Sequence, residues 1–140
     1  MDMRTLILPL LLSLALAACS KPVEVDPDIA EQPVPQFHMA LNGDHIDEIY
    51  NSGSEELRQH ESLQDFAARL ETVRRKMGPV QAANRQSWKA REESGSIFVT
   101  LTYKTTYAAG EAEEEFVVRM RDNVSKLASY KIKAKPLSTL

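Results

Sequence analysis

The feature that most constrains the fold is an alternation of apolar and polar side chains between residues 97 and 107. The polar positions are mostly threonines, and the apolar positions are Ile97, Val99, Leu101, Tyr103 and Tyr107. An alternation with period two predicts a β-strand that turns one face toward a core and the other toward water. Because one apolar sheet face must be covered by another element, the chain needs neighbouring strands and a cover.

Three further segments are predicted to be strands of the same sheet. They are residues 80–90, 111–121 and 125–135. The apolar face of the second of them carries Phe116, Val118 and Met120. The Asp122-Asn123 turn signal separates it from the last strand. In this last hairpin the register stays open, because Leu127 and Tyr130 have opposite parity.

The register of the two central strands depends on the loop between them. A two-residue loop at Ala109-Gly110 places Tyr103 opposite Phe116. The next pair on this face is Leu101 with Val118, so the apolar side chains share one side of the sheet. A three-residue loop would mix apolar and polar side chains across the strands, and we therefore expect the two-residue loop.

The clearest helical pattern covers residues 62–77. Its apolar side chains recur at steps of three and four and share one face: Leu63, Phe66, Ala67, Leu70, Val73 and Met77. Ser62 fits the N-cap position, and Gly78 followed by Pro79 ends the helix. Shorter helical pieces precede it at residues 37–41, 45–50 and 54–57.

Helices followed by an antiparallel meander predict an α+β domain over residues 37–140. We expect the N-terminal helices to pack across a four-stranded sheet, with Phe66, Leu70 and Val73 as the cover. The chain has 140 residues, enough for one small domain and a tail. Its net charge of −3 argues against a nucleic-acid binder that depends on phosphate contacts.

Residues 1–18 have the parts of an export signal. A weak positive region at Arg4 precedes an apolar run from Leu6 to Leu16, which is shorter than the roughly 20 apolar residues of a membrane-spanning helix. The stretch Leu16-Ala17-Ala18-Cys19 then resembles the lipobox of bacterial lipoproteins. That resemblance implies cleavage before Cys19, a thioether-linked diacylglycerol on its sulfur and an acyl chain on the new amine.

Several acyl chains on Cys19 would hold the protein stably on a membrane, because each buried methylene contributes about 0.8 kcal/mol. The alternative is an ordinary signal peptide cut before a free thiol, but Cys19 is the only cysteine and has no internal partner. In the lipoproteins that this stretch resembles, Ser20 after the cysteine favours the periplasmic side of the outer membrane over the inner membrane. We expect no cofactor besides this covalent lipid.

Residues 19–36 are predicted to be a disordered tether between the lipidated end and the domain. Four prolines lie among acidic residues here, with few apolar side chains and no helical or strand period. Such a composition is typical of a solvated linker that favours polyproline conformations. When extended, this linker would lift the domain roughly 50 Å from its anchor.

Three segments of the domain together carry a family resemblance. They are Arg75-Lys76-Met77-Gly78-Pro79-Val80, Phe98-Val99-Thr100-Leu101-Thr102-Tyr103, and the ending from Glu115 to Leu127-Ala128-Ser129-Tyr130-Lys131-Ile132. The chain over residues 37–134 resembles a family of small exported bacterial domains of unknown function. That resemblance implies a cystatin-like, nuclear-transport-factor-like fold, in which a helix packs across a curved sheet. The family brings no known activity and no catalytic residues.

Three aromatic side chains, Trp88, Tyr103 and Phe116, are candidates for lining a pocket on the concave face of such a sheet. Some enzymes of the wider superfamily place an acidic base and a hydrogen-bond donor there. Here Glu114 is the one carboxylate that an apolar strand face can turn inward. Because core packing explains the aromatic residues, and neither a nucleophile elbow nor a glycine-rich phosphate loop is present, we expect no enzyme.

A charged surface of the sheet is a candidate partner-binding face. Its residues are Glu113, Glu115, Arg119 and Arg121. The alternative is a solvated face with cross-strand ion pairs such as Lys104 with Glu115, each contributing at most about 1 kcal/mol.

The three histidines are His38, His45 and His60. A metal site would need ligands at i and i+4 on one continuous helix or a third ligand at a known spacing. Because Gly43 interrupts the helix between the first two, we expect three surface histidines and no metal site.

Together these patterns predict a lipid-anchored, non-enzymatic binding module that faces the periplasm and holds a protein of the cell envelope. An inhibitor or immunity lipoprotein against a toxin or hydrolase is one alternative. A small-ligand binder or enzyme that uses the concave sheet face is another, and a cavity lined by Trp88, Tyr103, Phe116 and a buried acid would favour it. A helix that fills this space would remove the site.

Overall fold

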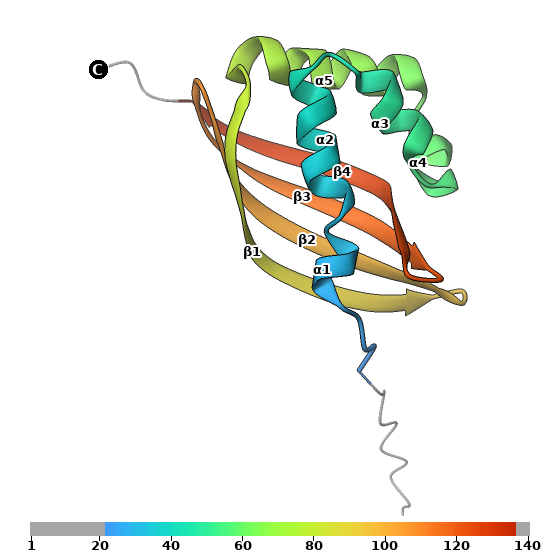
Figure 1. The fold of residues 1–140 in the computed structure, drawn as a ribbon. Helices are drawn as coiled ribbons and strands as arrows, with labels where there is room; N and C mark the ends of the chain where they lie inside the picture. Colours follow the sequence, from blue (N-terminus) through green and yellow to red (C-terminus); the bar gives the residue numbers. More distant parts are fainter. Residues whose placement is uncertain (1–21, 137–140) are drawn as a thin grey trace, which may run out of the picture.

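The computed structural model describes residues 22–136, in which five helices precede one four-stranded antiparallel sheet (Figure 1). The helices are α1 (Pro27–Ala30), α2 (Pro33–Asn42), α3 (Ile46–Ser52), α4 (Glu55–His60) and α5 (Leu63–Met77). The strands are β1 (Val80–Glu93), β2 (Ser96–Tyr107), β3 (Gly110–Arg121) and β4 (Val124–Pro136). Each strand pairs with its neighbour in sequence, so the chain has the α+β meander that the sequence predicts. The predicted export signal and Cys19 lie outside the described residues.

The register of β2 and β3 differs from the expected one by two residues. The observed pairs on the covered face include Val99 with Val118, Leu101 with Phe116, and Tyr103 with Glu114. The turn residues are Ala108 and Ala109, whose N–H groups donate to the carbonyls of Pro79 and Met77 at 3.0 and 2.9 Å. Because a shift of two residues leaves every side chain on the same face, the alternation of the sequence cannot distinguish the two registers.

A β-bulge at Ala128 determines the register of the last hairpin. Consecutive residues of β3 pair with Ser129 and Leu127 of β4, which leaves Ala128 between them as an extra residue. One extra residue reverses the side-chain parity along a strand. Leu127 and Tyr130 are therefore both buried in the core, although one has an odd and the other an even number.

Helix α2, rather than α5, lies across the covered face of the sheet (Figure 1). The ring of Phe37 packs with centroid distances of 5.1 Å to Phe116 and 4.5 Å to Tyr130. Helix α5 lies at one end of the sheet and packs mainly against α2 and α3, where Phe66 meets Tyr50 at 5.5 Å. The expected cover by Phe66, Leu70 and Val73 is therefore wrong, because α2 already occupies the sheet.

The predicted tether is also wrong from Pro27 onward. Residues 27–36 form α1 and the start of α2, and Ala30 and Val34 are buried in the core. Pro33 and Pro35 fit the first turn of α2, because the first four N–H groups of a helix have no intrahelical acceptor. Here prolines start a helix, and the folded domain begins well before residue 37.

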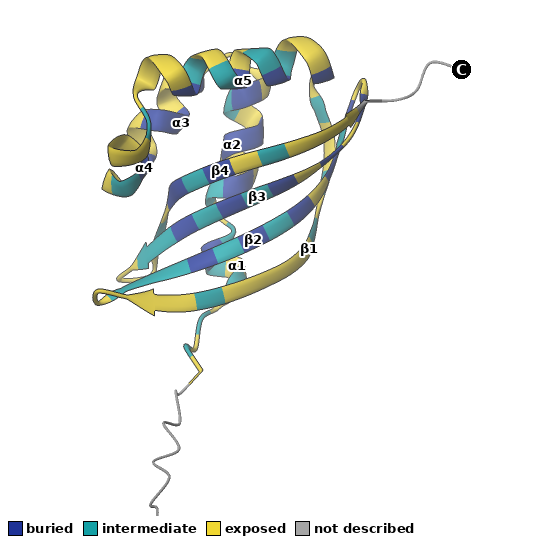
Figure 2. Cartoon of the chain, turned by 180° about the vertical axis from the view of Figure 1, so that it is seen from behind, coloured by how far each residue is buried: buried dark blue, intermediate teal, exposed yellow. Residues whose placement is uncertain are grey.

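Burial is unequal across the sheet. Buried positions alternate along β2 and β3, whereas β1 at the edge is exposed along most of its length (Figure 2). Helix α2 covers one face, and the other face is open to solvent apart from the part beside α4.

Candidate functional site

The most unusual residue of the covered face is Glu114, a carboxylate with 0% of its surface exposed. It lies in the acidic run of β3, where neighbouring side chains alternate between the two faces. Glu113 and Glu115 therefore point outward while Glu114 points inward. A carboxylate buried in this way is costly unless hydrogen bonds compensate it.

Three side chains from three different elements supply these hydrogen bonds. His38 of α2 donates from Nε2 to Oε1 of Glu114 at 2.8 Å, with the tautomer that a carboxylate partner selects. Tyr107 of β2 and Tyr130 of β4 donate their hydroxyls to Oε2 at 2.9 and 2.5 Å. The hydroxyl of Thr105, also buried, has no well-aligned hydrogen bond within residues 22–136. We call Glu114, His38, Tyr107 and Tyr130 the buried cluster.

The buried cluster favours the ionised form of Glu114. Burial by itself raises the pKa of Glu114, but the hydrogen bond and electrostatic attraction of His38, together with hydrogen bonding from Tyr130 and the nearby Thr105, leave the pKa below its usual value. Burial and the negative charge of Glu114 raise the pKa of Tyr107 and of Tyr130, so both hydroxyls stay protonated and donate. The cluster is thus a carboxylate held by three donors.

This arrangement joins α2 to the sheet. His38 follows Phe37 on the helix, and Glu114 is two residues from Phe116 on β3, so the polar contact lies directly beside the aromatic packing. A general base must come within hydrogen-bond reach of its substrate, whereas this carboxylate is enclosed and already holds three donors. The buried cluster therefore holds α2 against the sheet.

The three predicted pocket residues are not brought together around one cavity. Phe116 is fully buried against Phe37, and Tyr103 packs against it with its ring centroid at 5.6 Å. The hydroxyl of Tyr103 donates to Glu31 at 2.5 Å. Trp88 lies on the edge strand with 42% of its surface exposed. The space over the sheet is filled by α2, so the pocket prediction is wrong.

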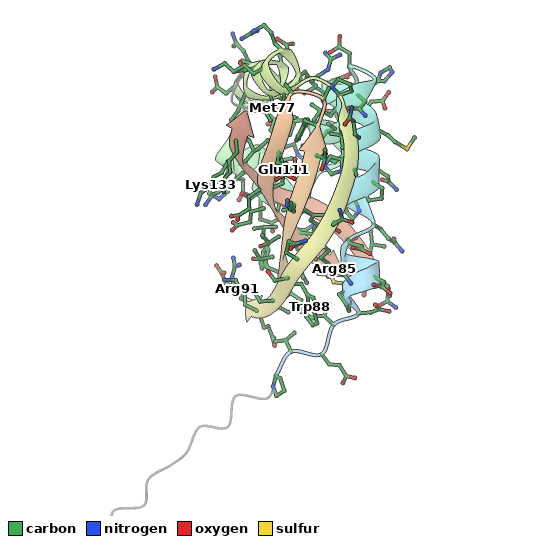
Figure 3. The ribbon with its side chains drawn as sticks, turned by 90° about the vertical axis from the view of Figure 1, so that its left-hand side faces the viewer. Met77, Arg85, Trp88, Arg91, Glu111 and Lys133 are labelled. Carbon is green, nitrogen blue, oxygen red and sulfur yellow. The ribbon has the colours of Figure 1, made fainter. Side chains whose placement is uncertain are left out.

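The four residues predicted for a partner-binding face share the open side of β3, spread along the strand from Glu113 to Arg121. Glu113 stands between Lys104 of β2 and Lys133 of β4, whereas the expected partner of Lys104 was Glu115. The Nη1 atom of Arg119 lies 3.0 Å from Glu56 of α4, and Arg121 is exposed near the end of the strand. Lys133 points away from α2, as Figure 3 shows.

The open face carries an ordered ladder of opposite charges. Three glutamates of β3 stand directly opposite three lysines of β4: Glu111 with Lys135, Glu113 with Lys133, and Glu115 with Lys131. The Nζ atom of Lys104 on β2 also lies 3.3 Å from Glu111. Cross-strand pairs of this kind stabilise the sheet by roughly 0.2–1 kcal/mol each.

A groove of about 520 Å³ continues from this ladder across all four strands and beneath α4. Its floor is formed by Phe98, Thr100 and Val117. Its rim carries both signs of charge: Lys89, Arg91 and Lys131, with Glu56, Glu93 and Glu115. A surface with an apolar floor and a rim of mixed charge has the anatomy of a protein-binding patch.

The histidines separate into two kinds. His45 and His60 are exposed as expected, with Nδ1 of His45 3.6 Å from Glu48. His38 is buried, so the expectation of three surface histidines is wrong for this one. Within residues 22–136, no three His, Cys, Asp or Glu side chains gather as metal ligands. Nor does any helix of this part have the length and apolarity to cross a membrane.

No protein-family model matches the chain, and neither does any curated protein. The family resemblance of residues 37–134 therefore stays a prediction.

Proposed function

We propose that this protein is a lipid-anchored, non-enzymatic binding module that faces the periplasm and holds an envelope protein on the open face of its sheet. The anchor would be Cys19 within Leu16-Ala17-Ala18-Cys19, on the periplasmic side of the outer membrane. We also propose membership of the family of small exported domains that the sequence resembles, since an α+β meander crossed by a helix is the fold that the resemblance implies.

The observation that carries the proposal is the contrast between the two faces. On the covered face, α2 and the buried cluster leave Glu114 enclosed. On the open face, the groove beneath α4 offers Val117 and Phe98 between charged side chains. A groove with an apolar floor and a charged rim suits a protein partner. The mixed charges would fix the position of the partner, and the apolar floor would contribute affinity.

An inhibitor or immunity protein is a version of the same proposal, in which the partner is a toxin or a hydrolase. The shape and charge of the groove fit both an envelope protein and a toxin or hydrolase. The identity of a captured partner would distinguish the two.

Site-specific crosslinking in intact cells tests the proposal. A photo-crosslinking residue replaces Val117 on the groove floor, and a second strain carries it in place of Glu71, an exposed position on α5. We expect a discrete protein adduct from position 117 and none from position 71. No adduct at position 117, or the same adducts at both positions, would contradict a binding role for the open face.

A further inference from the structure

The folded part of the chain begins very close to the proposed anchor. Val25 packs against the hydrophobic core, and α1 begins at Pro27. Val25 is the sixth residue after Cys19, and six residues span at most about 20 Å when fully extended. A lipid on Cys19 would therefore hold the domain at the membrane surface and would not let it reach across the periplasm.

The chain also leaves the fold at a defined place. The segment before α1 runs away from α1 and the lower part of β1, at the end of the molecule opposite α5 (Figure 1). Trp88 and Arg91 lie near this exit, whereas Met77 lies at the far end (Figure 3). The end of the sheet nearest to the anchor therefore holds the β3–β4 turn, which lines one hollow with Glu24 to Asp26, and the β1 edge, whose Arg85 contacts α1.

The chemistry of this edge suits the headgroup region of a bilayer. Trp88 is the only tryptophan of the chain and is 42% exposed. Lys89, exposed beside Trp88 on the same strand but turned to the other sheet face, can reach lipid phosphates, whereas Arg91 pairs with Glu93 at 3.1 Å. Tryptophan rings favour the boundary between acyl chains and water, and cations beside them contact phosphate groups.

We propose that the β1 edge around Trp88 rests on the headgroups of the bilayer in which the lipid is anchored. This placement rests on the proposed lipid anchor at Cys19. Because β1 is the edge strand of the sheet, both sheet faces then stand upright on the membrane, and α5 lies at the end of the domain farthest from it. A partner in the groove of the open face would lie beside the domain along the membrane surface.

The short arm, rather than electrostatic attraction, enforces this contact. Glu92 and Glu93 end β1, and Glu24 and Asp26 lie in the arm, so carboxylates offset Lys89 and Arg91 near the exit. The same domain without its lipid should therefore show no stable binding to vesicles.

Trp88 is itself the reporter for the test. The full chain, purified with its lipid, is reconstituted into phosphatidylethanolamine and phosphatidylglycerol vesicles that contain a lipid with a nitroxide on its headgroup. We expect this lipid to quench the emission of Trp88, because the exposed side of its ring would face the membrane. The Stern–Volmer constant for quenching of Trp88 by aqueous iodide should fall about two-fold relative to the detergent-solubilised chain.

The variant Trp88→Phe with Lys76→Trp moves the reporter to the exposed last turn of α5 and should show neither effect. A chain that floats with the vesicles while Trp88 is unquenched overturns the placement and leaves the anchor intact. Protection from iodide without nitroxide quenching indicates a second copy of the chain on the β1 edge and also overturns the placement. A chain that does not float with the vesicles overturns the anchor, and the placement with it.

Discussion

The two faces of the sheet hold carboxylates of the same strand in opposite ways. Glu114 is enclosed by α2 and receives hydrogen bonds from three side chains, whereas Glu113 and Glu115 point to solvent and stand opposite lysines. The three residues are consecutive and chemically identical. Burial and partners, rather than residue type, therefore decide which acid holds the fold together and which is free to meet another molecule.

The largest effect expected from this contrast is the loss of Glu114. The change Glu114→Ala leaves His38 and two tyrosine hydroxyls buried without their acceptor, so we expect the free energy of unfolding to fall by about 3–5 kcal/mol. Glu113→Ala on the adjacent residue should lower it by at most about 1 kcal/mol. Chemical denaturation of both variants measures the difference, and equal losses would show that the two faces do not differ.

The change Phe37→Ala tests whether α2 is the cover of the sheet. The side chain packs against Phe116 and Tyr130, so its removal should lower the free energy of unfolding by about 3 kcal/mol or more. Met39, two residues along the same helix, is 74% exposed, and Met39→Ala should change it by less than about 0.5 kcal/mol. Thermal or chemical unfolding measures both changes. If Phe37→Ala lowered the free energy of unfolding as little as Met39→Ala, α2 would not be the cover of the sheet.

The change Tyr130→Phe removes one donor from the buried cluster while keeping the ring. We expect a loss of about 1–2 kcal/mol in the free energy of unfolding, because Glu114 loses a buried hydrogen bond. Tyr103→Phe removes a hydroxyl that donates to Glu31 at the partly exposed rim, and it should cost about half as much. Urea titrations give both values, and a larger loss at Tyr103 would contradict the central place of Glu114.

A smaller effect should appear in the pH dependence of stability. The pKa of Glu114 in the folded chain lies below its usual value of 4.5, so its stabilisation is complete above about pH 4.5 and is lost as pH falls through the folded-state pKa. Glu114→Gln has no such titration, so its free energy of unfolding should fall less steeply in acid. Parallel curves for the two proteins would refute this assignment.

The smallest effect on stability is expected from exchanging a pair of the open face. The double change Glu115→Lys with Lys131→Glu keeps opposite charges across β3 and β4, so the free energy of unfolding should move by less than about 0.5 kcal/mol. The charge pattern on the groove rim is nevertheless reversed there. Chemical denaturation measures the change. A large fall in the free energy of unfolding would mean that the charge pairs stabilise the sheet strongly, as those of a solvated surface do not.

The sequence predicts the strands and their faces well, because period-two alternation is a local signal. It cannot fix the register of β2 and β3, since a shift of two residues preserves that alternation. The parity conflict between Leu127 and Tyr130 is a genuine signal of the bulge at Ala128, because only an extra residue can place both in the core.

The largest error concerns the N-terminal helices, and its cause is physical. Prolines at 33 and 35 suggest a linker, yet Ala30, Val34, Phe37 and Leu41 recur at steps of three and four and form the buried stripe. The buried cluster depends on contacts that sequence order does not show, because His38 and Glu114 are 76 residues apart. The inward parity of Glu114 is visible in the strand pattern, but its partner on α2 is not.

The most direct test of the division between the two faces is the yield of crosslinked adduct at Val117, per folded molecule, in cells. It is measured for an inner variant, Glu114→Gln, and for an outer variant, Glu115→Lys with Lys131→Glu. We predict that the inner variant keeps the adduct although it is less stable, and that the outer variant loses the adduct at unchanged stability. An outer variant that keeps the adduct, with an inner variant that loses it while still folded, would contradict this account and make the buried cluster the functional site.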